Sequence, residues 1–586
     1  MLKDFINEVD KLYEALKGSN NEEERKNNIK KFKEMFSIKK DIGEYYYKLV
    51  KNNRKKGIVY TPQYMAEYVI KNTISAENII KNPNIKIVDP SCGAGNFIIP
   101  CFLYLRNIFS KYLNDINKVN KMNLCKKDID KFIINNNIFG YDIDNIAIKI
   151  LKIDLYFYSG IFETYNIKLQ DFLLSDINSY FDIFIGNPPY VGVKFLDKEY
   201  STMIKNNFKE IFKDKSDISY CFFKKSLDVC KEGGKISFIT SRYFLEASSG
   251  KSLRNILKEN TYIKNIIDFY GIRPFKAIGI DPMIIFLQKK INNKEYECNT
   301  EVIRPKTNKN TDQFYKSVFL GEGNNYNKFL VSKENFYDEK WSLISTEIKN
   351  IVKTIEEKCD LELKDICTSY QGLISGCDKA FVIDNEIIEK ENLEIDIIKP
   401  WIKSSNINKN IITKSNSYII YSDLIKDEDQ YTNCLKHIST YKDKLEKRRE
   451  CIKGSRKWYK LQWGRKSEIF EEEKIIFPFK ASTNKFVLDK GSYFSADVYA
   501  LKIKEVDNYN YDYEKILKIL NSKIYEFYFK TFGKKLGDNL YEYYPNNIMK
   551  LKIPYGNLLK NQFSEEDLYR FFNITEEQRK IINNSL

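Results

Sequence analysis

The sequence predicts a doubly wound α/β sheet followed by a C-terminal domain of a different, α+β type. Between about residues 51 and 295, short apolar runs such as IKIVDP and FDIFIGNPPY alternate with amphipathic stretches of helical periodicity. That alternation is typical of a sheet with helices on both faces. The alternation ends in a polar, irregular segment from about 296 to 345. The length of 586 residues suits two major domains plus an appendage.

The N-terminal segment is expected to be a helical arm that docks elsewhere on the chain. Its apolar residues Phe5, Val9, Leu12 and Leu16 recur at helical spacing among polar and charged residues. The predicted parts of the chain are therefore the arm at 1–50, the α/β domain at 51–300 and the second domain at 301–586.

The composition excludes several classes of protein. Hydrophobic residues make up 43% of the chain and aromatic residues 15%, which argues against disorder, and no apolar run is long enough to span a membrane. The first residues lack the pattern of a secretory signal, so we expect a cytoplasmic protein. The 11 cysteines are scattered without a C-x-x-C pair, and His437 is the only histidine. Zinc sites, disulfide frameworks and histidine-based catalysis are therefore not expected, and no metal is predicted.

The formal net charge of +16 has two explanations. A polyanionic partner would favour it, because each phosphate neutralised by Lys or Arg releases counterions. A codon bias toward A and T, which enriches Lys, Asn, Ile and Tyr, would produce much of the same excess. Only the location of the charge separates the two.

Three predicted strand ends carry polar groups suited to a nucleoside. IKIVDPSCGAGNF places Asp89 and a glycine turn after an apolar strand, and glycine lets the backbone approach a ligand closely. The turn matches neither G-x-G-x-x-G nor the P-loop, so a dinucleotide or ATP is not the obvious ligand. Asp142 ends the strand IFGYD and suits ribose hydroxyls, whereas Asp171 and Phe172 suit an adenine amino group and ring. Each turn alone could be an ordinary strand-to-helix connection; three in order favour a nucleoside site.

The tetrapeptide Asn187-Pro188-Pro189-Tyr190 follows the apolar strand FDIFIG. Consecutive prolines fix their own φ angles and cannot extend a sheet, so the carbonyl groups there point in set directions. The Asn187 side-chain oxygen and the Pro188 carbonyl can accept hydrogen bonds from an exocyclic amine while Tyr190 stacks on its ring. Holding both amine hydrogens favours a tetrahedral nitrogen whose lone pair can attack a sulfonium methyl group without a strong base. The alternative is a rigid surface turn.

Together, GIVYTP at 57–62 and the DPSCGAGNF, GYDID, QDF and NPPY motifs resemble those of the gamma class of amino-methyltransferases. The resemblance implies a Rossmann-like sheet, S-adenosyl-L-methionine as cofactor and a recognition domain after the catalytic motifs. It implies that Thr61 and Asp89 hold the methionine end of the cofactor, Asp142 the ribose and Asp171 with Phe172 the adenine. The implied catalytic residues are Asn187, Pro188 and Tyr190, with Tyr190 and Phe275 stacking on the target base. The full set of predicted cofactor-binding residues is Tyr60, Thr61, Asp89, Pro90, Ser91, Gly93, Gly95, Asn96, Phe97, Asp142, Ile143, Asp171, Phe172 and Asn187.

The C-terminal half has its own resemblance. Stretches such as QGLISGCDKAF, FPFKASTNKF and YEYYPNNIMKLKIP resemble the recognition domains of the CamA-like clostridial orphan adenine methyltransferases, and more distantly those of restriction enzymes fused to methyltransferases. About fifty residues precede GIVYTP, fewer than a nuclease domain is expected to need. The resemblance implies a DNA adenine-N6 methyltransferase without an attached nuclease that acts as a monomer on double-stranded DNA, at an asymmetric, A-rich site.

Residues 442–465 carry ten basic side chains against three acidic ones, interleaved with aromatic residues. Such a mixture suits a nucleic-acid groove, in which Lys and Arg meet phosphates and some Arg residues read guanine edges. A solvated helix face is the alternative. The predicted DNA-binding residues in and beyond this segment are Arg448, Arg449, Arg456, Lys457, Trp458, Trp463, Arg465, Lys480, Asn484, Lys485, Lys534 and Lys535.

Two other functions fit part of the pattern. NPPY can grip any planar amine or amide, so a methyltransferase acting on RNA or on protein glutamine is one rival. The large basic C-terminal domain disfavours a protein substrate. A non-catalytic DNA-binding protein with an inactive methyltransferase fold is the other, and the presence of Asp89, Asp142, Asn187 and Tyr190 argues against it.

Overall fold

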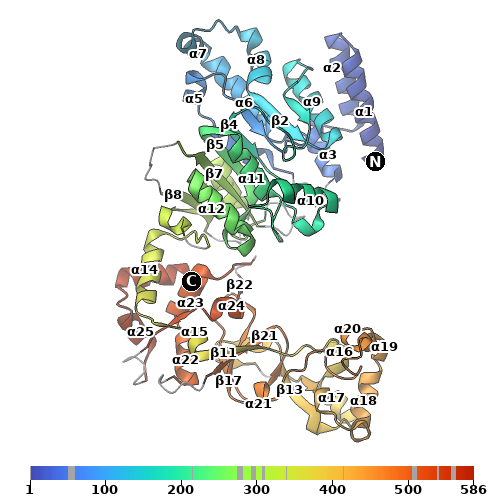
Figure 1. Ribbon diagram of the computed structural model, residues 1–586, viewed down its shortest axis with the longest axis vertical. Coiled ribbons are helices and arrows are strands. Elements are labelled where there is room, and N and C mark those ends of the chain that lie inside the picture. The colour runs from blue at the N-terminus through green and yellow to red at the C-terminus, as the bar shows by residue number, and fades with distance from the viewer. Residues whose placement is uncertain are drawn as a thin grey trace. The chain divides into compact units, whose positions relative to one another are not determined.

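The computed structural model describes residues 2–50, 60–213, 215–273, 281–291, 299–306, 311–337, 340–413, 415–504, 511–536, 540–555 and 562–586 (Figure 1). The chain divides into two compact units, unit 1 at 1–345 and unit 2 at 346–586. Among the described residues, no helix is both long and apolar enough to cross a membrane.

Unit 1 is built on one sheet, which has nine strands within the described residues, in the order β3-β2-β1-β4-β5-β7-β6-β8-β9. In the run β3-β2-β1-β4-β5 each strand is parallel to its neighbours, and β7 is antiparallel to both of its neighbours. The strands are β1 (Ile87–Asp89), β2 (Ile138–Asp142), β3 (Ile167–Leu169), β4 (Phe181–Gly186), β5 (Cys230–Ser241), β6 (Thr261–Asp268), β7 (Pro282–Lys289), β8 (Thr300–Pro305) and β9 (Tyr326–Val331).

Both faces of this sheet are buried. Successive strand residues point to opposite faces, so Ile87 belongs to one hydrophobic core and Val88 to the other, and Ile183 and Phe184 divide in the same way. Helices α4, α6 and α8 supply the first core, and α11 and α12 supply the second. The predicted doubly wound sheet is thereby confirmed. The helices are α4 (Gln63–Thr73), α5 (Ala76–Lys81), α6 (Ile98–Lys111), α7 (Leu113–Asn120), α8 (Ile129–Asn136), α9 (Asn145–Ser159), α10 (Lys198–Asn207), α11 (Ser219–Asp228), α12 (Lys251–Asn260) and α13 (Thr311–Tyr315).

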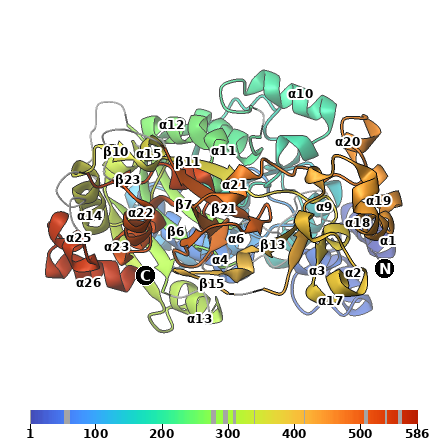
Figure 2. The same ribbon diagram turned by 90° about the horizontal axis from the view of Figure 1, so that it is seen from below.

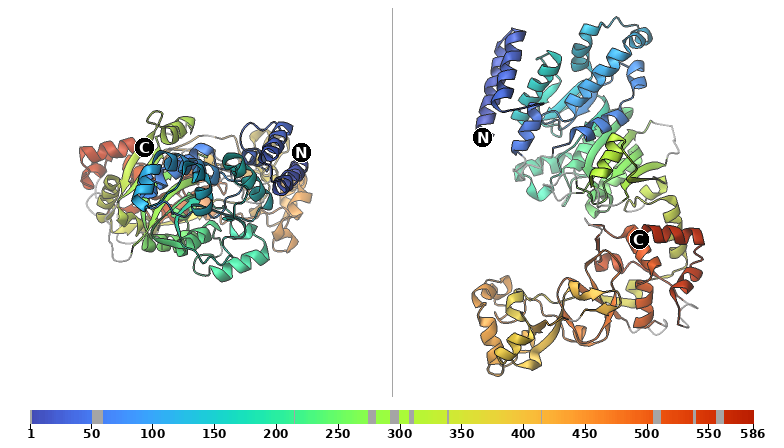
Figure 3. Two further views of the ribbon diagram at one scale, coloured as in Figure 1. Left: turned by 90° about the horizontal axis from the view of Figure 1, so that it is seen from above. Right: turned by 180° about the vertical axis from the view of Figure 1, so that it is seen from behind.

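The N-terminal arm consists of α1 (Leu2–Gly18), α2 (Glu22–Met35) and α3 (Ile42–Val50). Phe5, Val9, Leu12 and Leu16 are all buried, and they share a core with residues of α9. Figures 1 and 3 show the blue arm helices beside the sheet domain. The arm therefore packs within unit 1.

The described strands β8 and β9 extend the unit 1 sheet, although the sequence prediction assigns them to the second domain. β8 pairs parallel to β6, and β9 pairs antiparallel to β8. Only Val331 of the edge strand β9 is fully buried, and its sequence, YNKFLV, shows neither strict apolar–polar alternation nor an unbroken apolar run that would indicate a strand. The compact unit consequently ends at residue 345 rather than at 300.

Unit 2 has two hydrophobic cores. One joins the sheet β11-β21-β17-β19 to helices α14 and α22–α26, and the other joins the sheet β12-β16-β13-β20 to helices α16–α19 and α21. Figures 1 and 2 both show α22, α23 and α25 on one side of this unit and α17–α20 on the other. Its helices are α14 (Thr346–Glu357), α15 (Leu363–Ile366), α16 (Asp378–Phe381), α17 (Asn385–Lys390), α18 (Thr432–Ser439), α19 (Lys442–Glu446), α20 (Arg449–Ile452), α21 (Glu468–Glu471), α22 (Tyr513–Leu520), α23 (Lys523–Phe532), α24 (Pro545–Ile548), α25 (Glu565–Phe571) and α26 (Glu576–Ser585).

The strands of unit 2 are short. They are β10 (Leu361–Glu362), β11 (Cys367–Gln371), β12 (Val382–Ile383), β13 (Ile398–Ile402), β14 (Ile407–Asn408), β15 (Ile411–Ile412), β16 (Tyr418–Ile420), β17 (Lys474–Pro478), β18 (Lys480–Ala481), β19 (Val487–Asp489), β20 (Tyr493–Phe494), β21 (Val498–Ile503), β22 (Tyr541–Glu542) and β23 (Lys552–Ile553).

Candidate active site

A cavity of about 680 Å³ lies at the carboxyl ends of strands β1 to β4 in unit 1. In a doubly wound sheet this edge is where ligands bind. Of the predicted cofactor residues, the cavity is lined by Pro90, Ser91, Gly93, Asp142, Ile143, Asp171, Phe172 and Asn187. A second cavity of about 230 Å³ is lined by four others, Tyr60, Thr61, Gly95 and Asn96. The motifs that the sequence separates thus meet at one edge of the sheet.

The turn after β1 is held tightly by hydrogen bonds to its backbone. The Gly93 N–H donates to Asp142 Oδ2 (2.8 Å), and the Ser91 N–H donates to Asp89 Oδ1 (3.0 Å). Gly93 has a φ of +49°, and a Cβ there would lie 2.0 Å from the Tyr47 hydroxyl. Glycine is therefore required at this position by both backbone conformation and space.

Asp142 has a structural part in this turn. Besides the bond from Gly93, its Oδ1 accepts a bond from the Asp144 N–H (2.8 Å). Burial is the main cause that raises the pKa of Asp142. A carboxylate offers about four lone-pair positions, so two remain for ribose hydroxyls. Asp144 is committed differently, because it caps α9 and accepts a 2.8 Å bond from the Tyr46 hydroxyl.

Asp171 and Phe172 follow β3. Asp171 Oδ1 accepts bonds from the Leu173 N–H (2.8 Å) and the Leu174 N–H (3.3 Å). The Phe172 ring is buried and stacks on Phe222 with 6.0 Å between centroids. Phe172 consequently presents only part of its ring to the cavity that it lines.

Asn187 lies directly after β4 and joins the two cavities. Its Nδ2 donates to Thr61 Oγ1 (3.0 Å), and its Oδ1 accepts a hydrogen bond from the Tyr190 hydroxyl. Tyr190 is 6% exposed. The oxygen predicted to accept the target amine thus already has one donor, and an amide oxygen has a second lone pair.

Asp89 lies between the catalytic and cofactor motifs. It is 1% exposed, and a Cβ added to Gly186, the last residue of β4, would come within 2.7 Å of its Oδ1. Burial raises the pKa of Asp89 to about 8. A buried carboxyl group without an ion pair among the described residues favours a cationic ligand nearby, because a positive charge would stabilise the ionised form.

The residues present fit S-adenosyl-L-methionine. The cavity offers the carboxylates of Asp142 and Asp171 to hydroxyl and amino groups, and Ser91 Oγ is buried without a protein partner. Buried polar atoms need a partner, which a bound ligand would supply. Asp89, Phe97 and Tyr190 are themselves buried beside these walls.

Several lining residues escaped the sequence prediction. Tyr46 and Tyr47 come from α3 of the arm, and Tyr200 comes from α10 and bonds to Asp171. The Tyr47 hydroxyl accepts a 3.1 Å bond from the Ala94 N–H. The run EYYYKLV lies within the predicted helical arm, but helical periodicity does not say what a helix packs against.

Phe275 lies outside the described residues. Among the described residues, the buried Asp268 at the end of β6 is paired with Arg242 (3.1 Å) and Arg304 (2.8 Å). Arg273 also pairs with Asp281 at 2.6 Å.

In unit 2, the predicted DNA-binding residues differ in exposure. Asn484 is 1% exposed, donates to the Leu520 carbonyl and accepts from Tyr543, and Lys535 is 9% exposed. These two were expected on a surface, and the structure places them in the interior instead. The side chains of Arg448 and Arg456 bond within the protein, Lys534 pairs with Glu542 and Trp458 is half-buried. Lys485 is half-buried, and the exposed members are Arg449, Lys457, Trp463, Arg465 and Lys480.

Both halves of the chain match known families. Residues 136–275 match the Eco57I restriction-modification methylase family, and residues 399–553 match the TaqI-like C-terminal specificity domain. Type II methyltransferase M.BanIII of Aneurinibacillus aneurinilyticus is 25% identical over 543 residues, covering 86% of this chain and 90% of the relative. Type II methyltransferase M.BstVI of Geobacillus stearothermophilus is 25% identical over 398 residues, covering 66% of this chain and 69% of the relative.

A larger relative and a solved structure show the same pattern. The type II restriction enzyme and methyltransferase RM.Eco57I of Escherichia coli is 22% identical over 568 residues, which cover 82% of this chain but 55% of that enzyme. The type IIL restriction-modification enzyme MmeI in complex with DNA aligns with a TM-score of 0.54 and 14% identity over 95% of this chain and 74% of that one, which supports the fold. The methylase family depends on S-adenosylmethionine, which implies this cofactor here. The chain is a type II, adenine-specific DNA methyltransferase of the Eco57I/TaqI-like family.

Proposed function

We propose that the enzyme methylates N6 of an adenine that is flipped out of duplex DNA. The observation that carries the proposal is the position of Asn187, which lies at the wall of the cofactor cavity and is oriented by Thr61 and Tyr190. A base inside a duplex cannot reach such a site without leaving the stack.

The residues of this chain hold the amine rather than deprotonate it. The Asn187 side-chain oxygen and the Pro188 carbonyl accept bonds from the two N6 hydrogens, which frees the nitrogen lone pair. Bound S-adenosylmethionine supplies a methyl group on a positively charged sulfur. N6 would take that methyl group, the sulfur would keep the electron pair of its broken bond, and one N6 proton would leave to solvent.

Tyr190 orients the Asn187 amide before a base binds. Its hydroxyl bonds to Asn187 Oδ1, the same atom that is proposed to accept from the target amine. The second lone pair of that oxygen is available to the amine, so the base can enter without breaking the Tyr190 bond. The Tyr190 ring then stacks on the adenine and offsets part of the cost of flipping.

Three further properties belong to this proposal. The arm at 2–50 packs on α9 and lines the cofactor cavity, so it serves the methyltransferase site rather than forming a nuclease. The 586 residues are therefore proposed to methylate DNA without cleaving it. The enzyme acts as a monomer. The resemblance to the CamA-like orphan methyltransferases supports an asymmetric, A-rich site.

The test is methyl transfer from labelled cofactor to duplex DNA, RNA and protein, followed by long-read sequencing of DNA from cells that express the chain. Duplex DNA is expected to be labelled at adenine N6 within one sequence and to stay uncut with magnesium present. With 2-aminopurine at the target position, fluorescence should rise on binding. Label on RNA or protein alone, or an unchanged 2-aminopurine signal, would contradict the proposal.

A further inference from the structure

Residues 461–465 of unit 2, which we call the recognition loop, are held by hydrogen bonds from several other segments of this unit. The Leu461 N–H donates to Asp423 Oδ1 (3.1 Å), and Trp463 exchanges two 2.9 Å backbone hydrogen bonds with Ile374. The Tyr421 hydroxyl donates to the Arg465 carbonyl (2.7 Å). The loop backbone is thus fixed at its start, middle and end.

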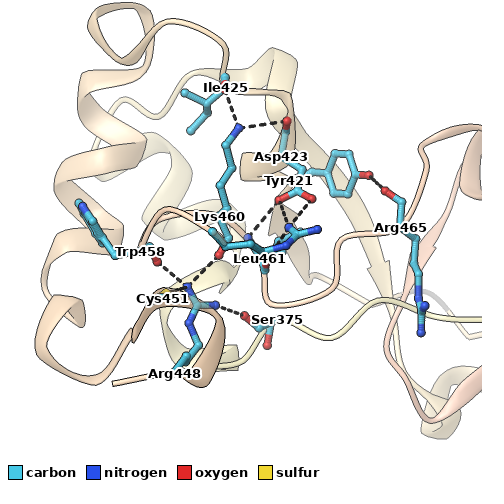
Figure 4. A network of polar contacts seen from close by, with 11 residues as sticks. Ser375, Tyr421, Asp423, Ile425, Arg448, Cys451, Trp458, Lys460, Leu461 and Arg465 are labelled. Carbon is cyan, nitrogen blue, oxygen red and sulfur yellow. Dashed lines mark hydrogen bonds and ion pairs between the residues drawn. The ribbon is translucent and has the colours of Figure 1, made fainter. Parts of the chain in front are cut away.

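Three cations near this loop bond to groups of the protein, and Figure 4 labels two of them, Arg448 and Lys460. Arg448 donates to the carbonyls of Ser375, Trp458 and Lys460, and Arg456 donates to Asp423 and to the Leu461 carbonyl. Lys460 Nζ donates to the carbonyls of Asp423 and Ile425. These charges bond within the protein and stabilise the loop, and Arg456 also lines the surface hollow described below.

The loop backbone is also under conformational constraint. A Cβ on Gly464 would lie 2.2 Å from Asp423 Oδ2, so only glycine fits beneath that carboxylate. Arg465 has a φ of +65°, which disfavours any residue with a Cβ. Such conformations persist where the surroundings hold them, and they gather at functional sites.

Two side chains emerge from this framework. Trp463 is 47% exposed, and the Arg465 side chain points away from the network in Figure 4. Arg465 Nη2 donates to Gln371 Oε1 (3.2 Å), and the Gln371 amide nitrogen is itself held by the Ala496 carbonyl (3.1 Å). The guanidinium is therefore oriented while much of it stays accessible.

Trp463 and Arg465 border a surface hollow of about 650 Å³. Tyr370, Lys466 and Lys502 add aromatic and basic character, and Glu468 is the acidic residue in its wall. Lys502 is paired with Glu472. Aromatic and basic groups around one hollow suit a base edge and its neighbouring phosphates.

We propose that Arg465 is a specificity-determining residue that reads a guanine edge in the DNA site, with Trp463 packed against the adjoining nucleotide. A planar guanidinium matches the O6 and N7 acceptors of guanine in the major groove. Tyr421 and Gln371 are positioning residues that aim it. This inference rests on the proposed function in duplex DNA.

The test compares wild type with Arg465→Gly, Arg465→Lys and the adjacent control Lys466→Ala on duplexes in which each position of the site is varied. Wild type should discriminate one G·C position by roughly tenfold or more, and both Arg465 variants should lose discrimination there and keep it elsewhere. Lys466→Ala should slow methylation of all duplexes evenly. Arg465→Gly should melt no lower than wild type, because glycine suits a φ of +65°.

A role confined to folding would give a different result. It predicts a lower melting temperature and equal loss at every position, and either that result or unchanged discrimination in both Arg465 variants would overturn the proposal. Tyr421→Phe should weaken discrimination at the same G·C position with kcat on the best duplex retained, and should add nothing in the Arg465→Gly background. An additive effect would refute the positioning role.

The proposed function can fail separately. If wild type methylates no duplex, the function is wrong, and the same variants are then compared by binding selection from the same DNA pool. Loss of preference at one G·C position in both Arg465 variants would still support the reading role, whereas unchanged preference would refute it.

Discussion

Asp154 Oδ2 accepts a 3.0 Å hydrogen bond from the Gly43 N–H, 111 residues earlier in the chain. Asp154 Oδ1 accepts a second bond from the Ile42 N–H (3.2 Å), so one carboxylate of α9 satisfies two free N–H groups at the start of α3. A Cβ on Gly43 would lie 2.6 Å from the Ala94 carbonyl oxygen. The arm is therefore pressed against the glycine turn of the cofactor site.

Loss of this anchor should disturb the cofactor site as well as the arm. Asp154→Ala leaves two buried N–H groups unpaired and should lower the free energy of unfolding by about 1–3 kcal/mol. It should also weaken cofactor binding, because Tyr46 and Tyr47 of α3 line the cavity. Thermal unfolding and calorimetry measure the two effects.

Asp10→Ala is the matched control, since it removes only the 2.7 Å ion pair with Lys149 between the same arm and α9. A partly exposed pair of this kind contributes about 0–1 kcal/mol. Equal effects of Asp10→Ala and Asp154→Ala on cofactor affinity would contradict the anchoring role.

Asp142→Ala should weaken S-adenosylmethionine binding by about 1–3 kcal/mol in calorimetry, because ribose hydroxyls would lose a charged acceptor. The variant should also melt at a lower temperature, since the Gly93 and Asp144 N–H groups lose their acceptor. Asp144→Ala should act on stability through the α9 cap and Tyr46. A larger loss of affinity in Asp144→Ala would transfer the ribose role to that residue.

Asn187→Ala should abolish methylation while cofactor affinity stays close to that of wild type, because the amide grips the target amine. Tyr190→Phe keeps the ring but loses the hydroxyl bonded to Asn187, and should retain far more activity than Tyr190→Ala. Single-turnover rates of methylation on duplex DNA rank the activities of these variants. Activity of Asn187→Ala above a small fraction of wild type would disprove its catalytic role.

The apoprotein should become less stable between about pH 5 and pH 8. Burial raises the pKa of Asp89 to about 8 and that of Asp154 to about 7, whereas both titrate near 3.9 in an unfolded chain. Across this window the folded state holds protons that the unfolded state releases, so stability falls as pH rises. Each group contributes at most about 1.4 kcal/mol per pH unit.

Denaturant unfolding at several pH values measures this slope, and Asp154→Asn should make it shallower. A cationic cofactor near Asp89 should also drive proton release on binding below pH 8, which calorimetry in buffers of different ionisation enthalpy detects. A stability that rises from pH 5 to pH 8 would contradict both assignments.

The sequence predicted the doubly wound sheet and the convergence of Asp142, Asp171 and Asn187, because each of these follows an apolar strand and parallel strands end at one edge. It did not predict the boundary at residue 345, because the exposed edge strand β9 lacks the apolar alternation that indicates a strand. The role of Tyr47 in lining the cofactor cavity was not predicted, because its hydrogen-bond partner Ala94 is distant in sequence.

The basic segment was the least predictable part. Charge counts treat Arg448 and Arg465 alike, yet Arg448 bonds to backbone carbonyls and Arg465 is exposed. A cation turned inward leaves no periodic signal in the sequence. Likewise Asn484 resembled a surface residue because only the fold brings Leu520 and Tyr543 to its amide.

The bonds from Asp423 and Tyr421 to the recognition loop have a consequence for engineering new target sequences. A transplant of residues 461–465 into a relative would carry Trp463 and Arg465 without the groups that aim them. The unit of exchange is discontinuous, comprising the loop, the 421–423 turn and the strand end at Gln371. Libraries that vary Trp463 and Arg465 on the intact framework should therefore yield more folded, selective enzymes than loop grafts.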